Sequence, residues 1–227
     1  MSPTEVMPHR VMSPTEVMSP TEVMTTGVTP SCQPALQSCS WNRPSAVRFE
    51  AMARPRLIIV SGPPGSGKTT LAHAIAVAMG CPAICRDEIK EGMVHAQPDF
   101  TPTPGDVLTE RTYFTFFQLL HVILGARATV VAEAAFQDQL WRPRLEGLAE
   151  IAELRIIECK VDEEVRRARR DQRDTSALRR AAHVGVTQSE LEGRPFEWIS
   201  LEAPKLRVDT TDGLSPPLPE IVEFINS

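Results

Sequence analysis

Short apolar stretches alternate with longer amphipathic stretches from residue 57 to the end of the chain. A strand that is covered on both faces reads as a short continuous apolar run, so these stretches predict strands over 57–60, 83–85, 128–132, 154–159 and 206–209. The stretches between them predict helices over 68–79, 87–95, 107–125, 137–150 and 162–180. We expect Pro143 to interrupt the fourth helix and a last short helix to begin near Pro219. Strands separated by helices indicate an α/β domain with a parallel sheet and helices on both faces.

The beginning of the chain lacks this pattern. The heptad MSPTEVM occurs at 1–7 and 12–18, and SPTEVM follows at 19–24. Each copy contains a proline and is too polar to contribute to a core. We therefore expect residues 1–53 to be a disordered low-complexity tail and residues 54–227 to be the folded domain. A short docking or regulatory motif in the tail is the alternative.

Residues 62–69 read GPPGSGKT, which fits the phosphate-binding pattern G-x-x-x-x-G-K-[ST]. The motif follows a predicted strand and opens a predicted helix, which is the setting that a phosphate-binding loop (P-loop) requires. Backbone N–H groups and the helix N-terminus would attract a phosphate, Lys68 would reach the β- and γ-phosphates of ATP, and the Thr69 hydroxyl would ligate Mg²⁺. A glycine-rich turn that binds nothing is the alternative. The residues predicted to bind the nucleotide in this segment are Gly62, Pro63, Pro64, Gly65, Ser66, Gly67, Lys68, Thr69 and Thr70.

Charged residues follow the second and third predicted strands. Because ligands of parallel sheets bind at the carboxyl ends of the strands, Asp87 is placed to accept a proton from a substrate hydroxyl, and Lys90, one helical turn later, to bind substrate phosphate. The alternative is that Asp87 caps a helix whose first turn is solvated. Glu133 follows the third strand, where it would hold a metal through water or bind substrate. A carboxylate bonded to neighbouring backbone N–H groups is equally compatible with the sequence.

The predicted helix after residue 161 is rich in arginine. Arg166, Arg169, Arg170 and Arg173 share one face, and they exceed the acids of the first turn in number. This pattern favours a lid whose arginines neutralise charge on a triphosphate, although a charged surface helix has the same composition.

Composition narrows the function classes. The 227 residues carry a net charge of −5, which argues against bulk nucleic-acid binding and a polybasic membrane anchor. Five cysteines form no C-x-x-C pair, and His73, His95, His121 and His183 show no metal-site spacing, so we expect structural roles for these histidines. No apolar run is long enough for a membrane helix, and we expect a cytoplasmic protein without a membrane partner.

Four blocks together resemble a known family: VSGPPGSGKTT at 60–70, RDEIK at 86–90, the spaced Arg169 and Arg173, and LRVDTTDG at 206–213. Over about residues 56–227 the chain resembles the P-loop kinases that include the phage-type polynucleotide 5′-hydroxyl kinase and many bacterial AAA family ATP-binding proteins. Zeta-toxin-like kinases are a more distant resemblance.

The resemblance implies a P-loop NTPase fold with a five-stranded parallel sheet in the order 2-3-1-4-5 and an arginine-rich helical lid over about 162–200. It implies that Asp87 is the general base, that Arg173 stabilises the transferring group, that Arg169 belongs to the nucleotide site and that residues 206–213 lie near adenine. The family has an arginine at the position of Lys90, and a lysine lacks that forked grip on phosphate.

We therefore expect an ATP- and Mg²⁺-dependent phosphotransferase. Its acceptor would be a hydroxyl of a small molecule or of a polynucleotide 5′ end. A zeta-toxin-like nucleotide-sugar kinase and a non-catalytic nucleotide-binding switch are the alternatives, and the switch would not need Asp87.

Overall fold

The computed structural model of the chain describes residues 53–97, 99–173, 177–183 and 196–227. Within these ranges five strands form one parallel sheet in the order β2-β3-β1-β4-β5, so the predicted fold class and strand order are confirmed. The strands are β1 (Arg56–Ser61), β2 (Ala83–Cys85), β3 (Val130–Glu133), β4 (Glu153–Lys160) and β5 (Lys205–Asp209). The tail predicted over residues 1–53 falls, except for its last residue, outside the described residues and stays a prediction.

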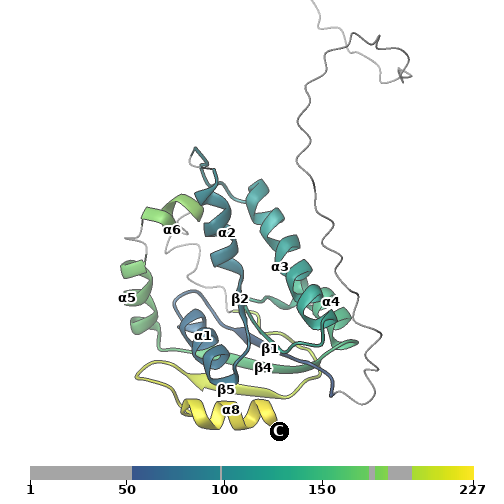
Figure 1. Cartoon of the computed structure of the whole chain (residues 1–227). Helices are drawn as coiled ribbons and strands as arrows, with labels where there is room; N and C mark the ends of the chain where they lie inside the picture. Colours follow the sequence, from purple (N-terminus) through teal and green to yellow (C-terminus); the bar gives the residue numbers. More distant parts are fainter. Residues whose placement is uncertain (1–52, 98, 174–176, 184–195) are drawn as a thin grey trace, which may run out of the picture. The chain divides into compact units, whose positions relative to one another are not determined.

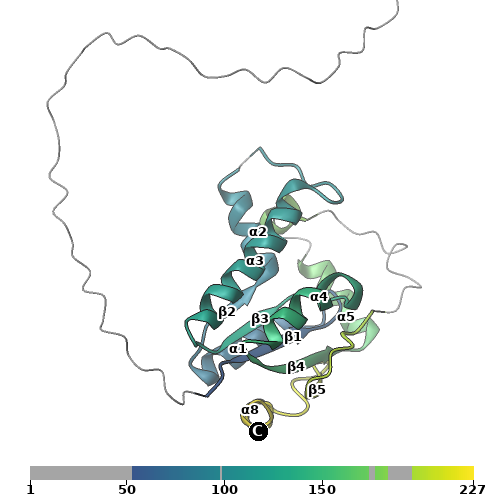
Figure 2. The same cartoon turned by 90° about the vertical axis from the view of Figure 1, so that its right-hand side faces the viewer.

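Helices cover both faces of the sheet (Figures 1 and 2). The helices of the described residues are α1 (Lys68–Met79), α2 (Arg86–His95), α3 (Val107–Gly125), α4 (Asp138–Ala149), α5 (Glu163–Arg173), α6 (Ala177–Ala182) and α8 (Leu218–Asn226). Helices α3 and α4 pack on one face, through a buried cluster that includes Phe116, Phe117 and Trp141. Helices α1 and α8 pack on the other face, where Leu71, Ile75 and Ile221 are buried. The sheet is therefore the middle layer of three, which explains the continuous apolar run of its central strand β1 from Leu57 to Val60.

Two predicted helices differ from the observed ones. Helix α4 continues through Pro143, because a single proline removes one backbone hydrogen bond and the buried Trp141 and Leu145 still hold the helix on the sheet. The helix predicted over 162–180 is instead α5 and α6, and the residues between them lie outside the described ranges. Helix α6 lies next to α2, where Ala182 packs against Val94 and Leu108 (Figure 1).

Candidate functional site

The register of the sheet brings three strand ends to the same level. Val60 of β1 pairs with Glu133 of β3, and Glu133 pairs with Cys85 of β2. The chain leaves β1 into the P-loop and leaves β2 into α2. Because β3 lies between β1 and β2, Glu133 stands between the P-loop and the start of α2, which carries Asp87.

The backbone of the P-loop adopts conformations that favour glycine. Gly65 and Gly67 have φ angles of 87° and 74°, in the left-handed region that favours glycine. A Cβ on Gly65 would lie 2.7 Å from the Arg166 carbonyl oxygen, so the loop touches the backbone of α5 closely. Gly67 is the N-cap of α1, and the first amide groups of that helix therefore face the loop. This is the arrangement in which a helix N-terminus binds phosphate.

Lys68 and Glu133 form a buried pair beside the loop. Lys68 Nζ lies 3.7 Å from Glu133 Oε1, and both side chains are almost fully buried. Burial raises the pKa of Glu133 and the charge of Asp87 raises it further, while Lys68, a hydrogen bond with Thr69 and the charge of Arg173 act in the opposite direction. Glu133 Oε2 is buried and has no hydrogen-bond partner among the described residues. The alternative of a carboxylate fully satisfied by backbone N–H groups is therefore wrong for this oxygen.

This unpartnered oxygen allows a test of the expected Mg²⁺. An acidic oxygen without a partner, next to the Thr69 hydroxyl, matches the oxygen donors that Mg²⁺ prefers. Thr69 and Glu133 are therefore residues that fit a magnesium ion, directly or through water.

Asp87 is held ionised near the same lysine. Its side chain is 30% exposed, and Arg86 Nη1 donates a hydrogen bond of 2.9 Å to its Oδ1. Burial opposes ionisation, but the charges of His183, Arg86 and Lys68 outweigh it and lower the pKa of Asp87 to about 2. Asp87 is thus a carboxylate at neutral pH, within electrostatic reach of the lysine that would hold the γ-phosphate.

A cavity of about 620 Å³ opens beside the P-loop. It is bounded by the loop, α1, α5 and the segment after β5, and its lining includes Thr69, Arg169, Arg173 and Gly213. The size suits a nucleoside. Two arginines of the predicted lid therefore face the space next to the P-loop, whereas much of the predicted lid segment 162–200 lies outside the described residues.

Thr210 connects this cavity wall to the P-loop. Its hydroxyl donates a 2.8 Å hydrogen bond to the Ser66 carbonyl oxygen, and its backbone N–H donates to Lys160. Arg169 Nη2 donates to the carbonyl oxygens of Thr210, at 2.7 Å, and Thr211, at 3.3 Å. The guanidinium of Arg169 thus orders the cavity wall, and Thr210 ties α5 to the loop.

Comparison with protein families identifies the group. A family model described as an AAA domain, AAA_33, matches residues 57–192, which is more than half of the chain. The chain belongs to this family. It is a P-loop domain of the kinase type, as the resemblance of its motifs indicated.

Solved structures agree with this assignment. A candidate kinase from Chloroflexus aurantiacus shares 25% sequence identity, over 77% of this chain and 98% of its own, with a TM-score of 0.67. The APS kinase CysC of Mycobacterium tuberculosis (14% identity, 78% of this chain and 100% of its own, TM-score 0.55) and Kti12 of Chaetomium thermophilum (15%, 75% and 99%, 0.54) share the fold. No curated protein gives a significant match. Among the residues that the structure describes, no helix is long and apolar enough to cross a membrane.

Lys90, which the sequence predicted as a site residue of this AAA domain, makes its contacts with α3. Lys90 is 3% exposed, and its Nζ donates hydrogen bonds to Asp106 Oδ2 (2.8 Å) and Thr109 Oγ1 (2.7 Å) at the N-terminus of α3. These contacts favour a structural role, and substrate binding by Lys90 stays a prediction that they do not support.

The structure also gives three residues roles that the sequence analysis did not assign to them. Arg86 and His183 contribute to the ionised state of Asp87, and Thr210 supports the P-loop. Arg86 directly precedes Asp87 in the RDEIK motif, so the sequence alone indicated that the two side chains are close. His183 is far from the P-loop in sequence, and no local pattern indicates its position near Asp87. Thr210 lies in the marked block 206–213, but nothing in that block indicates its hydrogen bond to the P-loop. Arg166 pairs with Glu163 through two hydrogen bonds, so this member of the arginine face is neutralised within α5.

Proposed function

We propose that the chain is an ATP-dependent kinase that transfers the γ-phosphoryl group of ATP to a hydroxyl of a small molecule or of a polynucleotide 5′ end. The observation that carries the proposal is the ionised Asp87, which lies within electrostatic reach of Lys68 at the edge of the sheet where the P-loop begins. A nucleotide-binding loop alone would support a switch. An anionic proton acceptor beside it supports transfer to a hydroxyl.

The P-loop side of the site would bind the donor. Lys68 and the amide groups at the start of α1 stabilise the negative charge of the phosphates, and the cavity lined by α1, α5 and Gly213 receives the nucleoside. Mg²⁺, which Thr69 and Glu133 would hold, neutralises phosphate charge when bound. In the absence of the metal, Lys68 partly compensates the charge of Glu133.

The Asp87 side of the site would bind the acceptor. The acceptor oxygen forms a bond to the γ-phosphorus, the bond to the β–γ bridging oxygen breaks, and ADP leaves with that electron pair. The hydroxyl proton passes to a carboxylate oxygen of Asp87. A carboxylate with a pKa of about 2 is a weak base, so it takes the proton only once the new P–O bond has made the hydroxyl strongly acidic. Before that point Asp87 orients the hydroxyl by accepting its hydrogen bond.

The arginines of α5 would act on the transferring group. Arg173 lines the cavity and is close enough to influence the ionisation of Glu133, which supports a role for its charge at the γ-phosphate end of the site. We assign to Arg173 the stabilisation of the transition state, and to Arg169 the ordering of the wall that contacts the nucleotide. We also propose that residues 162–200 form the lid and 54–227 the kinase domain.

The proposal is tested with γ-labelled ATP against a panel of acceptors. The panel contains 5′-hydroxyl oligonucleotides, nucleosides, sugars, aminoglycosides and nucleotide sugars, so the nucleotide-sugar alternative is one of its outcomes. With the acceptor that is labelled, Asp87→Asn should lower the transfer rate by about 10²- to 10⁴-fold and leave ATP affinity nearly unchanged. Asp99→Asn, at an exposed aspartate, is the matched control and should transfer at the wild-type rate.

Two outcomes would contradict the proposal. Wild-type transfer by Asp87→Asn would remove the role of this carboxylate. ATP binding without labelling of any acceptor in the panel would favour a nucleotide-binding switch. Lys68→Ala does not separate the hypotheses, because the kinase, the nucleotide-sugar kinase and the nucleotide-binding switch all predict impaired nucleotide binding.

A further inference from the structure

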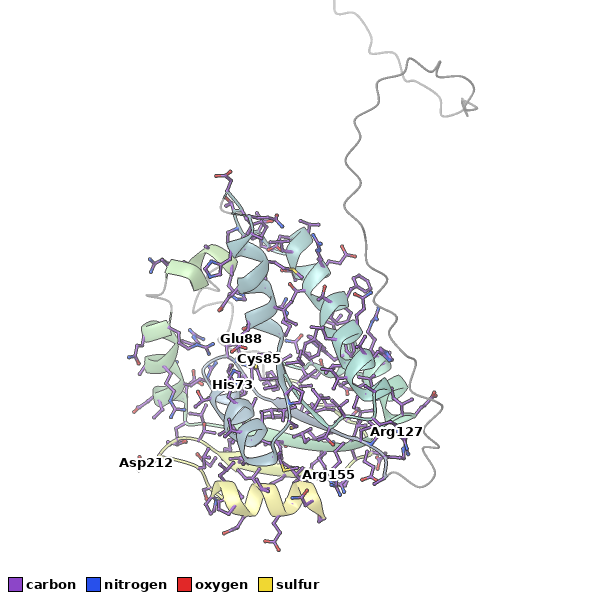
Figure 3. The ribbon with its side chains drawn as sticks, in the orientation of Figure 1. His73, Cys85, Glu88, Arg127, Arg155 and Asp212 are labelled. Atoms are coloured by element: carbon purple, nitrogen blue, oxygen red, sulfur yellow. The ribbon has the colours of Figure 1, made fainter. Side chains whose placement is uncertain are left out.

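Three side chains of metal-binding type meet where α1, the end of β2 and α2 come together. They are His73 of α1, Cys85 at the end of β2 and Glu88 of α2, and they lie close together in Figure 3. One ligand atom from each lies within 4.8 Å of the other two. The fold thus brings together three residues from three elements, up to 15 positions apart in the chain. Their spacing in the sequence does not predict a metal site.

We propose that His73, Cys85 and Glu88 form a binding site for a divalent transition-metal cation of the Zn²⁺ class. An imidazole nitrogen, a thiolate and a carboxylate are the donors found in zinc sites, and three protein ligands leave one position open. A sulfur and a nitrogen donor disfavour Mg²⁺, which selects oxygen. The site is therefore chemically distinct from the place where Thr69 and Glu133 would hold magnesium.

The separations already approach those of a tetrahedral site. With Zn–S of about 2.3 Å and Zn–N and Zn–O of about 2.1 Å, tetrahedral edges are about 3.6 Å for sulfur to nitrogen and about 3.4 Å for nitrogen to oxygen. Cys85 Sγ lies 3.7 Å from His73 Nε2, close to the first value. His73 Nε2 lies 2.8 Å from Glu88 Oε1, a distance that requires a hydrogen between the two atoms. A cation replaces this hydrogen, and the two atoms then separate by about 0.6 Å, which the ends of two half-exposed side chains can accommodate.

The burial of the three side chains and the charges around them also suit a metal site. Cys85 is 2% exposed, whereas His73 and Glu88 are half exposed, so the sulfur is fixed and a cation can enter from solvent. Burial and the nearby carboxylates of Glu133 and Glu88 raise the pKa of the Cys85 thiol. The thiol therefore keeps its proton when no cation is present, and a metal must displace that proton in order to bind. The same carboxylates give the site a negative potential that attracts a cation.

A cation at this position would join α1, β2 and α2. Cys85 and Glu88 flank Asp87 in the chain, so the metal would clamp the start of the helix that carries the proposed base. The inference rests on the three side chains and holds whether or not the chain transfers phosphate.

The test uses Co²⁺ as a spectroscopic substitute for Zn²⁺. A thiolate bound to Co²⁺ gives a sulfur-to-metal charge-transfer band that imidazole and carboxylate alone do not produce. The full chain is used, with His9→Ala, Cys32→Ser and Cys39→Ser in every sample, because these residues lie outside the described ranges and carry competing donors. Saturating Mg²⁺ is present throughout, so that oxygen sites are occupied.

Three variants remove one ligand each: His73→Ala, Cys85→Ser and Glu88→Gln. Cys81→Ser and His121→Ala are matched controls that remove the same groups from the turn after α1 and from α3. We expect one Co²⁺ per chain with the charge-transfer band, and loss of the band in Cys85→Ser. Affinity should fall by more than about 10-fold in His73→Ala, the lower bound for loss of a group that supports a metal. Both controls should bind as the parent does.

Thermal unfolding gives a second readout that does not depend on activity. Zn²⁺ should raise the Tm of the parent and of both controls, because a ligand that binds the native state stabilises it, and should leave the Tm of His73→Ala unchanged. His73 is half exposed, so this variant folds even if Cys85→Ser does not. Absence of a 1:1 complex in the parent, or equal affinity in the parent and His73→Ala, would overturn the proposal and leave His73 and Glu88 as an ordinary ion pair.

Discussion

Replacing Lys90 by methionine separates its two assigned roles, because one role concerns substrate and the other concerns stability. Methionine keeps the apolar stem and removes the ammonium. The Asp106 carboxylate then loses the 2.8 Å hydrogen bond from Nζ and the charge that compensates it, while its side chain stays about 5% exposed. The hydrogen bond from the Thr109 backbone N–H, at 2.7 Å, remains.

The structure gives the magnitude. Breaking a buried ion pair by removing one partner costs about 3–5 kcal/mol, because the remaining charge is uncompensated. We expect Lys90→Met to lower the free energy of unfolding by this amount. For a domain of this size, about 2–4 °C of Tm corresponds to 1 kcal/mol, so the Tm should fall by about 6–20 °C. Asparagine caps helices well, so Lys90→Met/Asp106→Asn should recover at least about 1 kcal/mol of the loss.

Urea unfolding followed by circular dichroism measures the effect. Glu146→Gln is the control, because it breaks an exposed pair with Arg142 and should cost at most about 1 kcal/mol. A loss below that value in Lys90→Met, together with a raised KM for the acceptor, would refute the structural role and support substrate binding. A large loss of stability with no recovery in the double variant would show that the ammonium acts through some contact other than Asp106.

The same pair predicts a pH dependence. Burial opposes ionisation of Asp106, but the hydrogen bonds from Lys90 and Thr109 outweigh it and lower its pKa below the ordinary value of 3.8. As the pH falls, the unfolded chain therefore binds this proton before the native chain does. The stability difference between the wild type and Lys90→Met should be complete above about pH 4 and shrink as the pH falls below 3.8. A difference that stays constant down to pH 2 would contradict this origin.

Three further substitutions test the P-loop and its supports. Glu133→Gln should lower the affinity for Mg²⁺–ATP, measured by calorimetry, more than the affinity for metal-free ATP; an equal effect on both would argue against a metal role. Thr210→Val leaves the Ser66 carbonyl oxygen without its buried donor and should cost about 1–3 kcal/mol in urea unfolding, whereas Thr210→Ser should restore most of it. Gly65→Ala places a Cβ 2.7 Å from a backbone oxygen at a φ of 87° and should abolish nucleotide binding, while Gly92→Ala, in open space on α2, should stabilise by about 0.5–1 kcal/mol.

The sequence predicted most of the elements because their signals are local. The pattern of apolar residues identified the helix over 68–79 and the strand over 83–85 with the observed bounds, since Gly80 ends the helix in a left-handed conformation and all three residues of β2 are apolar. The P-loop could be predicted for the same reason, because its glycines, Lys68 and Thr69 are close together in the chain. The strand before them and the helix after them indicate what these residues do.

The sequence did not predict which charged side chains would meet. Lys90 and Glu133 both read as site residues, but the ammonium of Lys90 turns to Asp106, which stands 16 positions later at the start of α3. The insertion of β3 between β1 and β2 decides that Glu133 lies beside Lys68, and the register of β3 with β2 decides that Cys85 lies beside Glu133. Similarly, α6 packs on α2 instead of extending α5, and His183 follows α6 into the neighbourhood of Asp87.

The chain's own pattern therefore determined a parallel α/β domain with a phosphate-binding loop, because hydrophobic period and turn chemistry act between neighbouring residues. The tertiary structure alone decided which side chains share that edge of the sheet: the unpartnered oxygen of Glu133, the ionised Asp87, the Thr210 link and the His73–Cys85–Glu88 cluster. These depend on strand order and register, which arise from packing between segments that are distant in sequence.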